Sequence, residues 1–147
     1  MNMPDVERQT ILLAEGEVIV RLAIGEYLRG CGQRVVEAAD AVEAKAVLQS
    51  GLEVHIVMSD AQLAGEENGF GLARWVRRYR PDVEVILTST ITGKAQAAAE
   101  FCAKSPSRAP YDSSGLAARI RTMMAERKRR TRPPSSTSPL LPRRRRS

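Results

Sequence analysis

Short apolar runs alternate with amphipathic stretches from Thr10 to about Lys128. Four of the runs predict strands, at residues 11–14, 34–38, 54–59 and 83–88. Apolar residues at helical spacing predict helices around residues 20–28, 41–50, 72–79, 94–103 and 113–128. The first strand is apolar throughout, which is typical of a strand that helices cover on both faces. The pattern therefore predicts an α/β fold of βα units around a parallel sheet.

A fifth strand is expected after the fourth predicted helix, but the sequence supports it poorly. The segment from Lys104 to Pro110 contains two prolines and no large apolar residue. Proline cannot donate a hydrogen bond to a strand ladder and is confined to edges and bulges. Any fifth strand is therefore expected to be short, irregular and at the edge of the sheet.

Charge and composition together indicate where the folded domain begins and ends. The net charge is +6 over 147 residues, yet positions 126–147 alone carry +8, which leaves −2 for the remainder. The residues from 131 onward are rich in Pro, Ser and Arg and have little to form a core. We expect a flexible N-terminus at 1–9, one domain at 10–128 and a disordered basic tail at 129–147.

The composition also excludes several classes of protein. The two cysteines, Cys31 and Cys102, have no CxxC spacing and there is one histidine, His55, so we expect buried thiols and neither a zinc site nor a disulfide framework. His55 is expected to be a packing residue and not a phosphodonor. The sequence has no apolar run of membrane-spanning length and no signal-peptide pattern, which predicts a cytoplasmic protein without membrane insertion.

Polar side chains are predicted at the carboxyl ends of three strands, where open parallel sheets bind ligands. Glu15 and Glu17 follow the first strand, Asp60 ends the third, and Ser89 follows the fourth. Together they could hold a hard cation or a phosphoryl group. Alternatively, acidic residues at these places cap the helices that follow.

Four segments resemble the receiver domains of bacterial two-component response regulators: ILLAEGE, MSDAQLAG, NGFGLARWVRRYRPDVEVILTS and PYDSSGL. They occur in the family's order and cover residues 10 to about 125. The resemblance implies a flavodoxin-like, doubly wound sheet of five parallel strands in the order 2-1-3-4-5. It also implies that Asp60 accepts a phosphoryl group from a phosphohistidine on a histidine kinase or phosphotransfer protein.

The resemblance assigns further roles around Asp60. Glu15, Asp60 and the backbone carbonyl of Gln62 match ligands of Mg²⁺, with Glu17 as a candidate substitute ligand. Ser89, followed by Thr90, matches the residue that binds the phosphoryl group and moves on activation. The signal would then pass to the surface of the last helices, where an unknown downstream protein binds.

Two positions depart from the family in ways that weaken this chemistry. Gly16 stands where the family has the second acid of its pair, and Ala109 stands where it has a lysine. A pair of unit charges about 4 Å apart is worth roughly 4 kcal/mol at an effective dielectric constant of about 20, before desolvation. Magnesium affinity and phosphorylation are therefore both expected to be weak.

Three functions remain open at this point. The first is a single-domain response regulator that accepts a phosphoryl group weakly and acts by protein contacts, not as an enzyme. The second is a phosphorylation-independent interaction module. The third is association with nucleic acid through the tail, against which stand the lack of aromatic residues in the tail and of a helix-turn-helix pattern.

Overall fold

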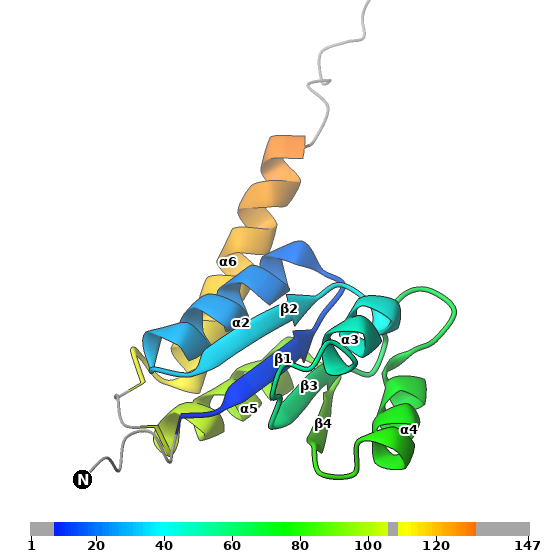
Figure 1. Cartoon of the computed structure of the whole chain (residues 1–147). Coiled ribbons are helices and arrows are strands. Elements are labelled where there is room, and N and C mark those ends of the chain that lie inside the picture. Colours follow the sequence, from blue (N-terminus) through cyan, green and yellow to red (C-terminus); the bar gives the residue numbers. More distant parts are fainter. Residues whose placement is uncertain (1–7, 106–108, 132–147) are drawn as a thin grey trace, which may run out of the picture.

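The computed structural model describes residues 8–105 and 109–131, and Figure 1 shows their arrangement. Nine elements follow one another along the chain: β1 (Thr10–Ala14), α2 (Val18–Gly30), β2 (Arg34–Ala38), α3 (Ala41–Leu48), β3 (Ile56–Asp60), α4 (Gly69–Tyr79), β4 (Glu84–Thr88), α5 (Ile91–Ala103) and α6 (Ser113–Thr131). The four strands and five helices predicted from the sequence are all present. Most boundaries differ from the prediction by one to three residues, as helix and strand ends commonly do.

The strands form one parallel sheet in the order β2-β1-β3-β4. In this register Ala14 of β1 lies beside Ser59 of β3, and Asp60 lies beside Thr88 of β4. The order agrees with the predicted 2-1-3-4-5 as far as it goes. A fifth strand is not found among the described residues, and residues 106–108 of the segment predicted to contain it lie outside them.

Alternating side chains divide the core between the two faces of the sheet. On β1, Ile11 and Leu13 face a cluster that includes residues of α2, α5 and α6. Leu12 and Ala14 face a second cluster that includes residues of α3 and α4. This alternation follows from the two-residue period of a strand, and it explains why β1 is buried at every position and apolar from Ile11 to Ala14.

The last two helices form an antiparallel pair on the α2 face of the sheet. Ala95, Ala98 and Cys102 of α5 are buried there, and their small side chains let α5 pack closely against its neighbours. The chain then turns at the end of α5 and returns as α6, which runs antiparallel to α2 (Figure 1). No strand is found between them among the described residues, and α5 and α6 both cover the same face.

Tyr27 fixes the start of α6 against the carboxyl-terminal half of α2. Its side chain is 1% exposed, and its hydroxyl donates a 2.5 Å hydrogen bond to the backbone oxygen of Tyr111. Burial raises the pKa of Tyr27, with smaller contributions from Tyr111 and Asp112. Pro110 packs nearby, since a Cβ added at Gly30 would lie 3.4 Å from its Cγ. The segment from 109 to 111 therefore lies at the amino ends of the strands.

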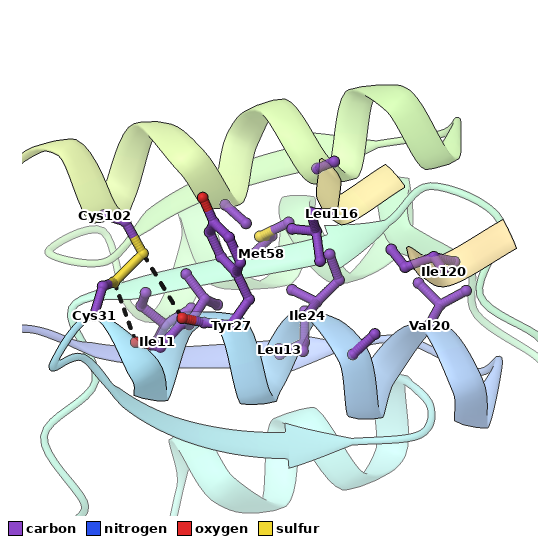
Figure 2. Packing of buried hydrophobic residues seen from close by; sticks show 14 of the residues in the cluster. Ile11, Leu13, Val20, Ile24, Tyr27, Cys31, Met58, Cys102, Leu116 and Ile120 are labelled. Carbon is purple, nitrogen blue, oxygen red and sulfur yellow. Dashed lines mark hydrogen bonds between the residues drawn. A yellow bond between two sulfur atoms is a disulfide. The ribbon is translucent and has the colours of Figure 1, made fainter. Parts of the chain in front are cut away.

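Cys31 and Cys102 form a disulfide, so the expectation of two buried thiols is wrong (Figure 2). Both residues are buried as expected, at 0% and 2% exposure. They are 71 positions apart in sequence, but the packing of α5 along α2 brings their Cα atoms to 5.6 Å. Disulfides of this kind are rare in cytosolic proteins, and the cytoplasmic location stays a prediction.

The domain boundaries also differ in part from the prediction. α6 continues to Thr131, so residues 129–131 of the expected disordered tail are helical. Lys and Arg are good helix formers and are favoured by the helix dipole in a last turn. Arg8 Nε donates to the oxygen of Gly32 over 2.9 Å, which orders that end of the expected flexible N-terminus. Residues 1–7 and 132–147 lie outside the described residues, so the nucleic-acid hypothesis stays a prediction.

Within the described ranges, every helix is too short or too polar to cross a membrane.

The disulfide should contribute measurably to the free energy of unfolding. Replacing both cysteines by alanine should lower the free energy of unfolding by about 2–4 kcal/mol, because the bond restricts the unfolded chain over a long loop. Urea unfolding of the parent with and without reductant, and of the double variant, measures this. The double variant should be insensitive to reductant. Complete alkylation of both thiols in unreduced native protein would contradict the disulfide.

Candidate functional site

Two carboxylates lie at the carboxyl ends of neighbouring strands. Glu15 follows β1 and is 3% exposed, while Asp60 is the last residue of β3. The Glu15 carboxylate accepts a hydrogen bond from the backbone N–H of Glu17 at 3.1 Å. The parallel register of β1 and β3 sets the two residues side by side at the carboxyl-terminal end of the sheet. The sequence prediction that these acids meet at this end is consistent with the structure.

A lysine that the sequence analysis did not select joins the two carboxylates. Lys94 Nζ lies 2.8 Å from Glu15 Oε1 and 3.2 Å from Asp60 Oδ2. The lysine side chain is 8% exposed, and the carboxyl side chains are 3% and 14% exposed. The site is therefore a mostly buried carboxylate–ammonium–carboxylate cluster with Asp60 as its most accessible member.

The position of Lys94 follows from the packing of α5. Lys94 lies on the buried stripe of this helix, at i, i+4 and i+8 with Ala98 and Cys102. Thr90 caps the helix by accepting a 2.9 Å hydrogen bond from the N–H of Gly93, so that the first turn begins directly beside the strand ends. A lysine that continues a stripe of buried small residues was the sequence signal for this contact.

The backbone around Asp60 is closely held. The N–H of Ala61 donates to the oxygen of Thr88 at 2.8 Å, and the N–H of Gln62 donates to Asp60 Oδ1 at 2.9 Å. A Cβ at Gly69 would clash with the backbone oxygen of Asp60, so only glycine fits where α4 begins. These contacts hold the backbone on either side of Asp60, and the Gln62 N–H orients its carboxylate.

Ser89 and Thr90 follow Thr88, the strand partner of Asp60, and both are exposed. The hydroxyl of Thr90 is used as the cap of α5. Ser89 thus lies at the open rim of the site. The phosphoryl-binding role assigned to these two residues by the resemblance stays a prediction.

Glu17, the candidate substitute metal ligand, is held away from Asp60. Its carboxylate caps α2 by accepting from the N–H of Ile19 and pairs with Arg127 Nη1 of α6 at 2.6 Å. The hydrogen bond from Arg127 lowers the pKa of Glu17, with smaller contributions from Ile19 and Arg21. The side chain therefore serves the alternative role considered for it, that of a helix cap.

The two degenerate positions lie in different places. Gly16 is exposed beside Glu15, and a Cβ there would lie 3.4 Å from the oxygen of Ala39, an ordinary contact. Ala109, in contrast, is next to Pro110 at the opposite edge of the sheet, beside the end of α2. A lysine at position 109 would not reach Asp60 in this fold. The positive charge at the site comes from Lys94 instead.

The residues present do not fit a resident Mg²⁺ ion. Only two carboxylates converge, and an ammonium bridges them where a cation would bind. No group of three or more metal-ligating side chains occurs in residues 8–105 and 109–131. Magnesium requires near-octahedral oxygen coordination at about 2.0–2.1 Å, which this arrangement does not offer.

His55 makes polar contacts at the start of the sheet, and the expectation that it packs and does not donate a phosphoryl group stays a prediction. It precedes β3, and its Nδ1 accepts a 3.0 Å hydrogen bond from the N–H of Thr10. Its Nε2 lies 3.6 Å from a carboxylate oxygen of Glu53. These contacts fix the start of the sheet, at the end away from Asp60.

No family model matches the chain. Among curated proteins, the sensor kinase CckA from Brucella abortus (strain 2308) is 40% identical to it over 81 residues. The alignment covers 54% of this chain and 8% of the relative, so the chain spans less than a tenth of that protein's length.

The solved structures that resemble this one include receiver domains of response regulators. A response regulator receiver protein from Pseudomonas putida has 26% identity and a TM-score of 0.52, over 56% of this chain and 68% of that one. The receiver domain of NtrX from Brucella abortus has 24% identity and a TM-score of 0.53, over 83% and 99%. A receiver domain protein from Clostridium thermocellum has 19% identity and a TM-score of 0.53, over 84% and 99%, and shares the fold.

The Glu17–Arg127 pair predicts a pH-dependent contribution to stability. A lowered carboxyl pKa stabilises the fold above the unfolded value of about 4.3, and the stabilisation is lost as the pH falls through the folded-state pKa. Replacing Arg127 by glutamine should lower the free energy of unfolding slightly at pH 7, because both side chains are partly exposed and solvent screens the pair. Urea unfolding at pH 7 and again in acid, below the folded-state pKa of Glu17, should show this difference at pH 7 and none in acid. Arg130→Gln is the control, and an equal loss at both pH values would contradict the pairing.

Proposed function

We propose that this chain, which has the receiver-domain fold of two-component response regulators, accepts a phosphoryl group on Asp60 at a low rate and signals through protein contacts. One observation carries the proposal. Asp60 ends β3 at the rim of the sheet with its carboxylate partly accessible, and a buried ammonium lies 3.2 Å from its Oδ2. The donor would be a phosphohistidine on a histidine kinase or phosphotransfer protein.

The chemistry requires a nucleophile and a nearby positive charge. A carboxylate oxygen of Asp60 would attack the phosphorus, forming an O–P bond as the N–P bond of the phosphohistidine breaks and its electron pair returns to the imidazole. The phosphoryl oxygens are anionic and repel the carboxylates. Lys94 offsets that repulsion because its ammonium contacts both acids.

The rate is expected to be low for two reasons. Gly16 removes one carboxylate from the site, and Glu17 is occupied by Arg127. Magnesium, which the family uses to neutralise phosphoryl charge, should therefore bind weakly. In addition, Asp60 must give up part of its contact with Lys94 before it can attack.

The same contact supplies a route for the signal. Lys94 belongs to the first turn of α5, and α5 packs against α2 and α6. A phosphoryl group on Asp60 would change the partners of Lys94 and so bias the position of α5. A downstream protein that binds the exposed side of α5 and α6 would sense this change.

Phosphorylation is tested by intact-mass measurement. Incubating the parent with phosphoramidate and Mg²⁺ should add one phosphoryl group slowly, and Asp60→Asn should add none. The adduct should be labile to hydroxylamine, as an acyl phosphate is. Absence of the adduct on the parent after prolonged incubation would reject the proposed phosphoacceptor role.

A second candidate is an interaction module that does not depend on phosphorylation. The observation that favours it is that the charge of Asp60 is already compensated by Lys94, so the fold needs neither metal nor phosphoryl group. In that case the surfaces of the helices alone would recognise a kinase or another regulator.

Restoring the missing acid separates the two functions. Gly16→Asp has space for its side chain and should increase the rate of phosphoryl transfer by about tenfold or more by adding a metal ligand. Ala109→Lys is the matched control and should have no effect, since position 109 is at the opposite edge. If only Gly16→Asp takes the phosphoryl group, the parent is a passive module. If Ala109→Lys raises the rate instead, the described placement of residue 109 is wrong.

A further inference from the structure

We propose that Lys94 takes the place of the divalent cation in this site, so that the chain supplies its own positive charge and metal can bind only when the ammonium leaves. The inference builds on the proposed function, since it concerns the same carboxylates. It does not depend on whether Asp60 is phosphorylated.

The first argument is position. Nζ of Lys94 lies within hydrogen-bond distance of one oxygen of Glu15 and one of Asp60. A cation shared by these two carboxylates would have to occupy the space between them. An ammonium and a metal ion cannot both fill that space, so their binding is competitive.

The second argument is the charge of the cluster. The two carboxylates and Lys94 together carry one net negative charge. A divalent cation added beside the ammonium would make this mostly buried cluster net positive, which is costly where water is largely excluded. Removing Lys94 would leave two unpaired carboxylates, and a divalent cation would then neutralise them.

The third argument is the cost of placing a lysine here at all. Lys94 as a whole residue is 7% exposed, and lysine is almost never fully buried unless it is paired with an opposite charge. It also lies near the amino end of α5, where the helix dipole disfavours positive charge. Both effects oppose this placement, so the two carboxylates must hold the side chain there. A lysine that served only to cover α5 would extend into solvent.

Metal titrations of charge variants test the proposal. Lys94→Met keeps the length of the side chain and removes its charge, Lys94→Arg keeps the charge, and Lys104→Met is the control on the exposed end of the same helix. Each protein is titrated with Mn²⁺ followed by electron paramagnetic resonance and with Mg²⁺ followed by calorimetry. Lys94→Met should bind both ions at least about tenfold more tightly than the parent, a shift of about 1.4 kcal/mol. Lys94→Arg and Lys104→Met should bind like the parent.

The double variant Glu15→Gln/Lys94→Met should lose the gain in affinity, which locates the metal at these carboxylates. Equal or weaker binding by Lys94→Met would overturn the proposal. If Lys94→Met does not fold alone, its thermal unfolding is followed against Mn²⁺ concentration. A folded state recovered by the ion supports the proposal, and unfolding independent of the ion rejects it. A parent that takes no phosphoryl group but shows this metal pattern would remove the proposed function and leave the role of Lys94 intact.

Discussion

The packing of α5 against α2 and α6 is the constraint on which both the site and the disulfide depend. Its buried stripe begins with Lys94 and ends with Cys102, joined by small side chains. The helix starts at the carboxyl ends of the strands and runs to the opposite end of the sheet. The same face of α5 therefore places Lys94 beside the two carboxylates and Cys102 beside Cys31. The covalent bond to Cys31 then holds α5 along α2 (Figure 2).

The two acids of the site are the ones expected from the sequence, but its positive charge comes from a residue that was not expected, Lys94. Glu15 and Asp60 are brought together by parallel pairing of β1 and β3, which depends on strands that the sequence pattern identifies. The charge that balances them comes from a helix, at a position that the family resemblance did not mark. A buried ammonium with two acceptors is stable in water-poor surroundings only when both contacts are kept, so the three side chains act as one unit.

The strands could be predicted because their apolar runs are short and bounded by turn residues, and their parallel arrangement follows from the helices between them. The face of the sheet that α5 covers could not be predicted, since alanine carries a weak amphipathic signal. In addition, no fifth strand separates α5 from α6 among the residues that the structure describes. The expectation of free thiols at Cys31 and Cys102 was wrong, and Lys94 was not selected as a site residue, for the same reason: the position of α5 was not known from the sequence. The displacement of Ala109 to the far edge has the same origin, because the chain reverses direction before that residue.

The antiparallel return of α6 has a consequence for how anionic molecules approach. Because Arg127 contacts Glu17 beside the carboxyl ends of the strands, the next residues, Lys128, Arg129 and Arg130, extend past that same edge. They add positive charge to the end of α6 that lies nearest that edge. Electrostatic steering of this kind accelerates encounter and weakens as ionic strength rises. Anionic molecules should therefore reach this edge of the sheet faster at low ionic strength than at high ionic strength.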